Sequence, residues 1–291
     1  MNKLFLVVAA SLLLAGCSKK EGLQQQPEVF APVHISVNGF TITQDTIPNR
    51  DDPATYFTKG SITLAFYDAA GTEVYKTTQI EGDGSYTTFG QFTATLQVGT
   101  YTMVTVAYAY SDGDGFTLTS PTSAAFTSER PRETFCKTQS VTVTSASPLN
   151  LSVTLDRISS WLFIQSTDTR PAGIAKIRTT YAKGGKIFNP TTGLATSDAG
   201  FTQTNNPSSA VGAIIQVSSF PLLFTDEENI NVTIEVLDSS DNVLFSHTVE
   251  NVPFKRNRKT TLLGAVFTAG TSSAGFQLDT DWLTPLDPIN F

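Results

Sequence analysis

Apolar residues in this chain recur at every second position, and this period narrowly limits how the chain can fold. Val33, Ile35 and Val37 alternate with polar or small residues, and the segment 62–66 repeats the pattern. Successive side chains of a β-strand point to opposite faces of a sheet, so a period of two predicts strands with one face in a core. No segment longer than about ten residues carries an apolar stripe of helical spacing. The chain is therefore expected to be all-β.

The predicted strands fall into two series with turn-rich segments between them. The first series is Val33–Thr43, Ile62–Phe66, Val74–Ile80, Phe89–Leu96, Tyr101–Tyr110, a strand near Phe116, Ser140–Thr144 and Leu149–Leu155. The second is Trp161–Gln165, Ile174–Ala182, Ala213–Val217, Ile230–Leu237, Val243–Val249, Lys259–Thr268 and Phe276–Trp282. The Gly-, Asn- and Pro-rich stretch 184–209 is expected to be a long loop or lid. Many short strands with turns between them are typical of sandwiches, and 291 residues fit two domains, predicted at 32–155 and 156–291.

The N-terminal segment is predicted to be an export signal. Lys3 gives it a positive start, and Leu4–Leu14 is an apolar run too short to span a bilayer as a helix. The run ends in Leu14-Ala15-Gly16-Cys17, which resembles the bacterial lipobox, where the cysteine is diacylated and the preceding peptide removed. The alternative is an ordinary signal with an incidental cysteine. Residues 1–16 are interpreted as a signal peptide, 17–31 as a polar, flexible, lipidated tether, and acylated Cys17 as the attachment to outer-membrane lipid.

The remaining composition argues against several classes of partner and chemistry. A net charge of −7 disfavours binding of nucleic acid through charge. With Cys17 acylated, Cys136 has no partner for a structural disulfide within the chain. His34 and His247 lie far apart, and no metal-ligand spacing, nucleophile elbow or phosphate loop accompanies them. We therefore expect no catalytic residue, no metal and no cofactor.

Three charged segments have a functional and a structural interpretation. Asp112–Gly115 resembles the start of a calcium loop, but Ser123 stands where an EF-hand needs glutamate, so a turn is favoured. The basic cluster Lys255–Lys259 lacks interleaved aromatic residues and is interpreted as a solvated loop before a strand. The carboxylates Asp226–Glu228 follow an apolar segment, and no pKa shift is expected there.

Several stretches are similar to those of the Bacteroidetes fimbrillins and their fimbrial-anchor relatives. They are Ile62–Asp68 with Gly71, Val98–Val104, Leu155–Arg157, Asn251–Gly264, and Asp281-Trp282 with the terminal Phe291. The resemblance covers nearly all of the chain after Cys17. It implies two tandem transthyretin-like β-sandwiches and subunits of type V pili that polymerise by donating a strand into a neighbour's groove. An exposed sheet edge and an apolar groove make such donation favourable in general.

The resemblance also implies roles for particular residues. A protease would cut after Arg50, behind the strand Val33–Thr43, and so free the groove, whereas anchor-type relatives keep this strand. The segment Phe276–Phe291 would reach a partner subunit. Asp45-Thr46-Ile47 is similar to an O-glycosylation acceptor, which would place sugar on Thr46. The expected function is a non-catalytic fimbrial lipoprotein of the outer membrane, an anchor, tip or stalk that supports cell adhesion at the cell surface or in the fimbrium.

The alternative interpretation is a surface lipoprotein that binds carbohydrate. Such a protein needs exposed aromatic side chains on a binding face, and Trp161, Tyr181 and Trp282 are the candidates. Trp161 lies in an apolar strand and is expected to be in the core. The sequence identifies no ligand on a host or bacterial surface for either interpretation.

Overall fold

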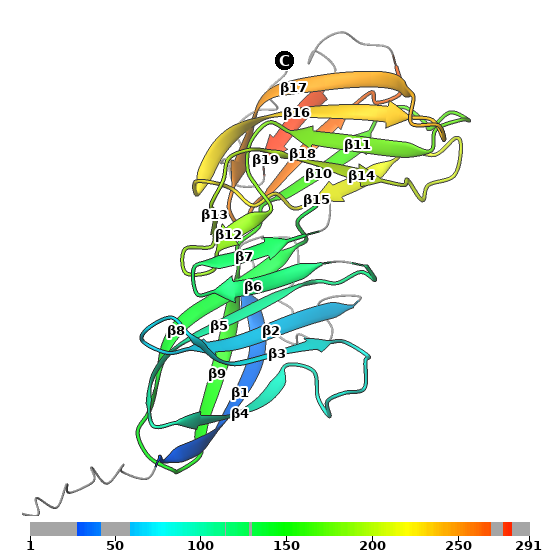
Figure 1. Ribbon diagram of the computed structural model, residues 1–291. Helices are drawn as coiled ribbons and strands as arrows, with labels where there is room; N and C mark the ends of the chain where they lie inside the picture. Colours follow the sequence, from blue (N-terminus) through cyan, green and yellow to red (C-terminus); the bar gives the residue numbers. More distant parts are fainter. Residues whose placement is uncertain (1–27, 42–58, 114, 128–129, 269–275, 281–291) are drawn as a thin grey trace, which may run out of the picture.

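The computed structural model describes residues 28–41, 59–113, 115–127, 130–268 and 276–280, and every element in these ranges is a β-strand (Figure 1). The all-β prediction is thereby confirmed. In the ranges just given, no helix has the length and apolar character needed to cross a membrane. The strands are β1 (Phe30–Thr41), β2 (Gly60–Tyr67), β3 (Glu73–Ile80), β4 (Gln91–Gln97), β5 (Gly99–Ala109), β6 (Phe116–Ser120), β7 (Ser123–Phe126), β8 (Thr134–Val143), β9 (Leu149–Arg157), β10 (Trp161–Ser166), β11 (Lys176–Tyr181), β12 (Ile187–Asn189), β13 (Leu194–Ala195), β14 (Phe201–Asn205), β15 (Gln216–Ser219), β16 (Glu227–Leu237), β17 (Val243–Lys255), β18 (Lys259–Gly264) and β19 (Phe276–Thr280).

The N-terminal half is one bent sheet with the strand order β3-β2-β5-β8-β9-β1-β4. The sheet encloses an apolar core to which β4 contributes Phe92, Ala94 and Leu96, while the residues between them are exposed. The alternation seen in the sequence therefore places one face of each outer strand in the core. The strands β8 and β9 pair at Phe135–Arg157 and Cys136–Asp156, near the joint between the halves.

The C-terminal half repeats this topology with an added strand. Its two sheets have the orders β14-β11-β16-β17 and β15-β10-β18-β19, and a second core lies between them. In both halves the first strand runs parallel to the last strand of the repeat: β1 pairs with β9, and β10 pairs with β18. On its other side each first strand pairs antiparallel with a short strand, β4 or β15. The strand β19, antiparallel to β18, has no counterpart among the described strands of the N-terminal half.

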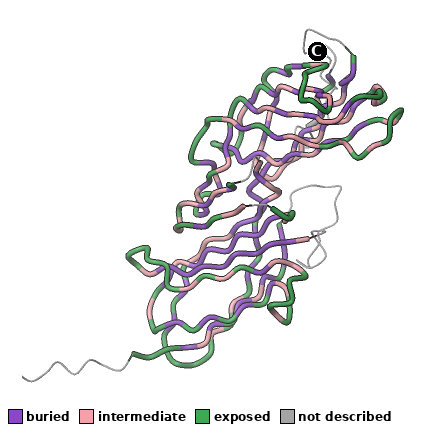
Figure 2. The backbone as a smooth tube through the Cα atoms, turned by 45° about the vertical axis from the view of Figure 1, so that its right-hand side comes forward, coloured by how far each residue is buried: buried purple, intermediate pink, exposed green. Residues whose placement is uncertain are grey.

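A small antiparallel sheet with strands from both halves connects them. Its order is β13-β12-β7-β6, so a hairpin from the N-terminal half pairs with strands that follow β11 (Figure 1). The prediction of a long loop or lid over 184–209 is therefore wrong, because β12, β13 and β14 lie in that stretch. Phe188 accounts for the difference: it is buried in a third core that also contains Phe126 and Tyr108. Figure 2 shows buried residues in both halves and in the short strands between them.

The joint between the halves is closely packed around Gly193. This glycine has φ +71°, and a Cβ atom there would lie 2.7 Å from the Cγ2 of Ile158. A side chain at this position would therefore have to displace Ile158 and would also strain the backbone. The strand β9 ends at Arg157, beyond the boundary predicted between residues 155 and 156, and the division into two domains at that point stays a prediction.

Candidate functional site

The residues predicted to be modified lie outside the described ranges. Cys17, Thr46 and Arg50 fall in segments that the structure does not describe, and so does the aromatic candidate Trp282. Lipidation, glycosylation and processing therefore remain predictions. The element that carried the assembly prediction, the first strand, is described almost in full as β1.

The strand β1 lies inside the N-terminal sheet with a neighbour on each side (Figure 1). It pairs antiparallel with β4 from Phe30 to Ser36 and parallel with β9 from Val33 to Thr41. A register shift between Val37 and Gly39 interrupts the pairing with β9. The first described strand therefore occupies a slot that later strands form, and its removal would leave both β4 and β9 without a partner on that side.

The inward side chains of β1 fill a large part of the N-terminal core. Val33, Ile35, Val37 and Phe40 are all buried, and the ring centroids of Phe40 and Phe135 lie 4.5 Å apart. At about 1.5–3 kcal/mol for each buried side chain, these four contribute roughly 6–12 kcal/mol. Because a whole domain is stable by only about 5–15 kcal/mol, the N-terminal half cannot lose β1 unless another strand replaces it.

The outward side chains of β1 from His34 to Thr41 are polar, whereas Phe30 at its start is exposed. His34 Nδ1 lies 3.1 Å from Thr93 Oγ1 on β4, and Asn38 Nδ2 donates to Ser152 Oγ on β9 at 2.6 Å. The strand has no Asp, Glu, Lys or Arg residue. Backbone pairing and an alternating apolar face therefore hold it in place, and both are features that a foreign strand can supply.

A buried glutamine holds β4 independently of β1. Gln79 on β3 is 6% exposed; its Nε2 donates to the carbonyl of Gln91 at 2.7 Å, and its Oε1 accepts from the amide of Gly90 at 2.8 Å. The hydroxyl of Tyr75, also on β3, donates to the carbonyl of Thr93 at 3.0 Å. The strand β4, which forms one wall of the β1 slot, is therefore attached to β3. Our sequence reasoning missed this contact, although Gln79 shares the inward face of β3 with Tyr75.

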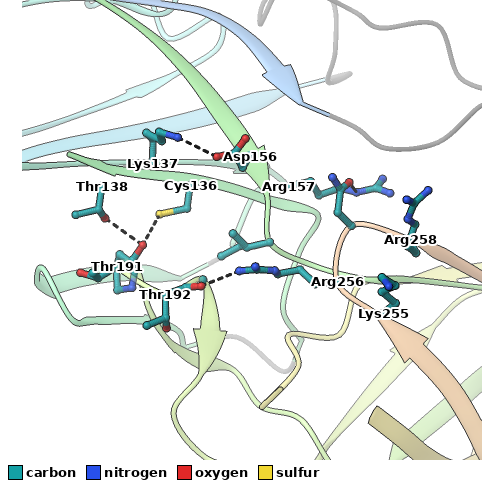
Figure 3. Close-up of a pocket in the computed structure, with 14 residues that line it drawn as sticks. Cys136, Lys137, Thr138, Asp156, Arg157, Thr191, Thr192, Lys255, Arg256 and Arg258 are labelled. Carbon is teal, nitrogen blue, oxygen red and sulfur yellow. Dashed lines mark hydrogen bonds and ion pairs between the residues drawn. The ribbon is translucent and has the colours of Figure 1, made fainter. Parts of the chain in front are cut away.

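A cleft of about 510 Å³ opens between the halves, and Figure 3 shows the pair Lys137–Asp156 and the contact of Arg256 with Thr192 on its walls. Lys137 Nζ lies 3.1 Å from Asp156 on one wall, and Arg256 Nη1 donates to the carbonyl of Thr192 at 2.7 Å on the other. Arg256 also pairs with Asp226 at 2.9 Å. The interpretation of the basic cluster as a solvated loop was incomplete, because this arginine ties the turn between β17 and β18 to the joint.

The other side of the same turn connects to β9. Asn257 has φ +59°, and its Oδ1 accepts from Arg157 Nε at 3.0 Å. The guanidinium of Arg157 is buried and pairs with Glu133 at 3.0 Å. These neutralised groups make the cleft a structural joint between the halves.

The cysteine and the histidine that could carry chemistry both have structural roles where the structure describes them. Cys136 is buried in the wall of the cleft, where its thiol donates to the carbonyl of Pro190 at 3.4 Å. Burial raises the pKa of this thiol to about 12, so it is not a nucleophile at neutral pH. His247 is buried and its Nε2 lies 3.1 Å from the carbonyl of Val266. Within the described ranges no group of three or more His, Cys, Asp or Glu residues could hold a metal.

Two charged segments can be compared with their predictions. Asp112 and Gly113 form a turn in which Gly113 has φ +87°, as the turn interpretation predicts. Asp112 also pairs with Lys59 at 2.7 Å. The expectation of unshifted carboxylates is wrong at Glu228. Burial raises the pKa of this side chain, although its Oε1 accepts from the amide of Phe224 at 2.7 Å.

The aromatic candidates for a carbohydrate site differ in exposure. Tyr181 is buried, with its hydroxyl bonded to that of Ser219, so it is not available to a ligand. Trp161 was expected in the core but is half-buried on β10. Its ring stacks with Phe220 at 6.1 Å between centroids and lies 5.0 Å from Lys259 Nζ.

Comparison with known proteins gives a family and a fold. No curated protein matches the chain. A candidate adhesin from Bacteroides ovatus is similar in structure, with a TM-score of 0.52 and 11% identity over 90% of this chain and 95% of that chain. A candidate polysaccharide-binding protein from Bacteroides thetaiotaomicron gives 0.51 and 10% over 90% and 100%. The fimbrial anchor protein Mfa2 from Porphyromonas gingivalis gives 0.50 and 10% over 86% and 97%. Residues 106–286 match the family of unknown function DUF6562, and the chain belongs to that family.

Proposed function

We propose that this chain is a non-catalytic fimbrial subunit of the cell surface that joins its neighbours by completing a β-sheet and so supports adhesion. The seating of β1 carries the proposal, because this first described strand fills a slot between two later strands. The likeness of the whole fold to a fimbrial anchor protein supports the same reading. Lipid on Cys17 would hold the subunit at the outer membrane.

The slot of β1 is suited to exchange because each of its walls has an attachment besides β1. Gln79 and Tyr75 attach β4 to β3, and β9 continues into the joint between the halves. Once β1 has left, an incoming strand would therefore meet a groove with two unpaired edges. The donor is proposed to be the segment Phe276–Phe291 of a neighbouring copy.

Cleavage after Arg50 would prepare this exchange without completing it. Arg50 lies between the end of β1 at Thr41 and the start of β2 at Gly60. A cut there separates β1 from the rest of the chain, but its backbone pairs and buried side chains still hold it. Sequencing the N-terminus separates the roles: a start at Asp51 indicates a stalk or tip, and a start at Cys17 indicates an anchor or a lipoprotein that does not polymerise. A glycan on Thr46 would appear as added mass on the peptide that contains it.

A disulfide between β1 and β4 tests the exchange. His34 and Thr93 are paired residues whose side chains touch, so H34C/T93C places two thiols at a distance that a disulfide can span. Cells that make the oxidised double variant should show no fibres by electron microscopy, and a reductant should restore them. The single variants H34C and T93C serve as controls and should form fibres throughout. Normal fibres from the oxidised double variant would overturn exchange at the β1 slot.

Carbohydrate binding is the second candidate, and one observation favours it. Trp161, Phe163 and Phe220 are half-buried aromatic residues in contact, with ring centroids 6.2 Å apart for Trp161 and Phe163. Aromatic faces of this kind can stack against sugar rings. Calorimetry against a panel of glycans, with Trp161→Ala as the matched variant, tests it: heat that W161A abolishes supports a glycan site, and no heat excludes it.

A further inference from the structure

In each half two layers of strands face each other, and the layers approach on two sides. Described residues bridge the layers on three of these four sides. Gln79 bridges β3 to β4 in the N-terminal half. Gln203 does the same in the C-terminal half, where its Nε2 donates from β14 to the carbonyl of Ser218 on β15 at 3.0 Å. The strand β19 closes the side between β17 and β18: it pairs with β18, and Phe276 contacts the ring of His247 on β17 at 5.7 Å between centroids.

The fourth side, between β8 and β9, has no such closure within the described ranges. The two strands pair at Phe135–Arg157 and Cys136–Asp156 and then diverge. From Leu149 to Leu155, β9 pairs with β1 on one edge, and no described strand pairs with its other edge. We call this second edge of residues 149–155 the outer edge of β9. It corresponds in the repeat to the edge of β18 that β19 covers.

The outer edge of β9 also lacks the usual protection of a free edge. Residues 149–155 include no charged residue, no proline and no glycine. Leu149 and Leu151 are half-buried and pack on the core, and Asn150, Ser152 and Thr154 are exposed and neutral. Natural proteins normally guard such an edge with charges, prolines or bulges, because it can pair with another chain.

We infer that the outer edge of β9 accepts the β19 segment of a second copy of this chain. The internal repeat supplies the argument, because β19 already shows how a strand fits the equivalent edge: antiparallel, with Phe276 buried and Gln277 exposed. Placed beside β9, the same segment would set Leu278 against the half-buried Leu151 and Phe276 against the buried Val153, with Gln277 opposite Ser152. This inference rests on the proposal that the C-terminal segment reaches a partner.

The consequence differs from exchange at the β1 slot. Pairing at the outer edge leaves β1 in place, so an uncut, lipid-anchored copy can hold a neighbour. Residue contacts separate the two modes. A donor in the β1 slot lies between β4 and β9, whereas a donor at the outer edge lies beside β9 and away from β4.

Cysteine crosslinking of the full mature chain tests the inference. A copy with Ser152→Cys on β9 is mixed with a copy with Gln277→Cys on β19, and oxidation should yield the mixed disulfide dimer. A matched acceptor with Thr95→Cys, an exposed residue of β4, should yield none. Cys136 is buried and does not compete. Adding Leu151→Lys to the Ser152→Cys acceptor should abolish the dimer, and Asn150→Lys in its place, where the side chain points to solvent, should spare it.

Each other outcome has a definite meaning. Mixed dimers through both Ser152→Cys and Thr95→Cys would place the donor in the β1 slot, which supports the proposed function and overturns this inference. Dimers between two Ser152→Cys copies without Gln277→Cys would show that two β9 edges pair with each other, which also overturns it. No dimer of any kind would overturn the inference, while fibres blocked by the oxidised H34C/T93C pair would leave the proposed function standing.

Discussion

Ile35→Ala should destabilise the N-terminal half by several kcal/mol, because Ile35 is the centre of the β1 slot. Its side chain is buried in the core, and its neighbours in the ladder are Phe92 on β4 and Leu151 on β9. Removing such a side chain from a close-packed core costs about 2–5 kcal/mol, because the cavity only partly collapses. This loss is a large share of the roughly 5–15 kcal/mol by which a domain is stable.

Hydrogen exchange followed by mass spectrometry measures this loss of stability in the N-terminal half, where Ile35 lies. Tryptophan fluorescence would report elsewhere, since Trp161 and Trp282 both follow residue 160. A loss of about 2–5 kcal/mol should speed exchange of the central strand β5 by about 30- to 5,000-fold if exchange follows global opening. Thr154→Ala, on the exposed face of β9, is the control and should change the rate only slightly. If Ile35→Ala raised the exchange rate of β5 by less than about twofold, the seating of β1 in the core would be refuted.

Three further predictions concern groups found in the structure. Gln79→Ala should lower the stability of the N-terminal half by about 1–3 kcal/mol, because the substitution leaves the amide of Gly90 and the carbonyl of Gln91 unpaired. Urea unfolding followed by hydrogen exchange measures this loss, and an unchanged urea midpoint would mean that β3 does not hold β4. Cys136 should resist a thiol reagent at pH 8 in the folded chain and react once urea unfolds it, because burial raises its pKa to about 12; rapid labelling of the folded chain would contradict this. Because burial raises the pKa of Glu228, its contribution to stability is fully present below the ordinary pKa of 4.5 and is lost as the pH rises through the folded value. Glu228→Gln should therefore remove that loss and make the chain more stable at pH 7 than the parent, and a less stable variant would show that burial is not the dominant cause.

The alternation of apolar residues was enough to predict most of the outer strands. β4, for instance, has a strict period of two because one of its faces lies in the core and the other in solvent. β8 shows where this signal fails. The sequence predicted a strand from Ser140 to Thr144, but β8 begins at Thr134, and its first three residues are all buried because the joint covers both faces. A strand buried on both faces loses the period that identifies it.

The site could be predicted in part. The first strand was identified as the exchangeable element, and the structure places it between β4 and β9. Its partners could not be read from the sequence, because Ile35 pairs with Phe92 and Leu151, which are distant along the chain. The strands β12 and β13 were missed for a similar reason, since such short strands acquire their structure from pairing: β12 pairs with β7, and β13 pairs with β12. The outer edge of β9 became visible once the two halves could be compared strand by strand.

The central claim is that subunits join when a strand from one copy pairs with β9 of another. Electron cryomicroscopy of fibres isolated from the cell surface tests this claim directly, at a resolution that allows the side chains of the strands beside β9 to be identified. The account predicts that a strand of a neighbouring copy lies beside β9, either in the slot of β1 or on the outer edge. Fibres in which neighbours touch through side chains alone, with β1 in place and the outer edge of β9 unpaired in every copy, would contradict it.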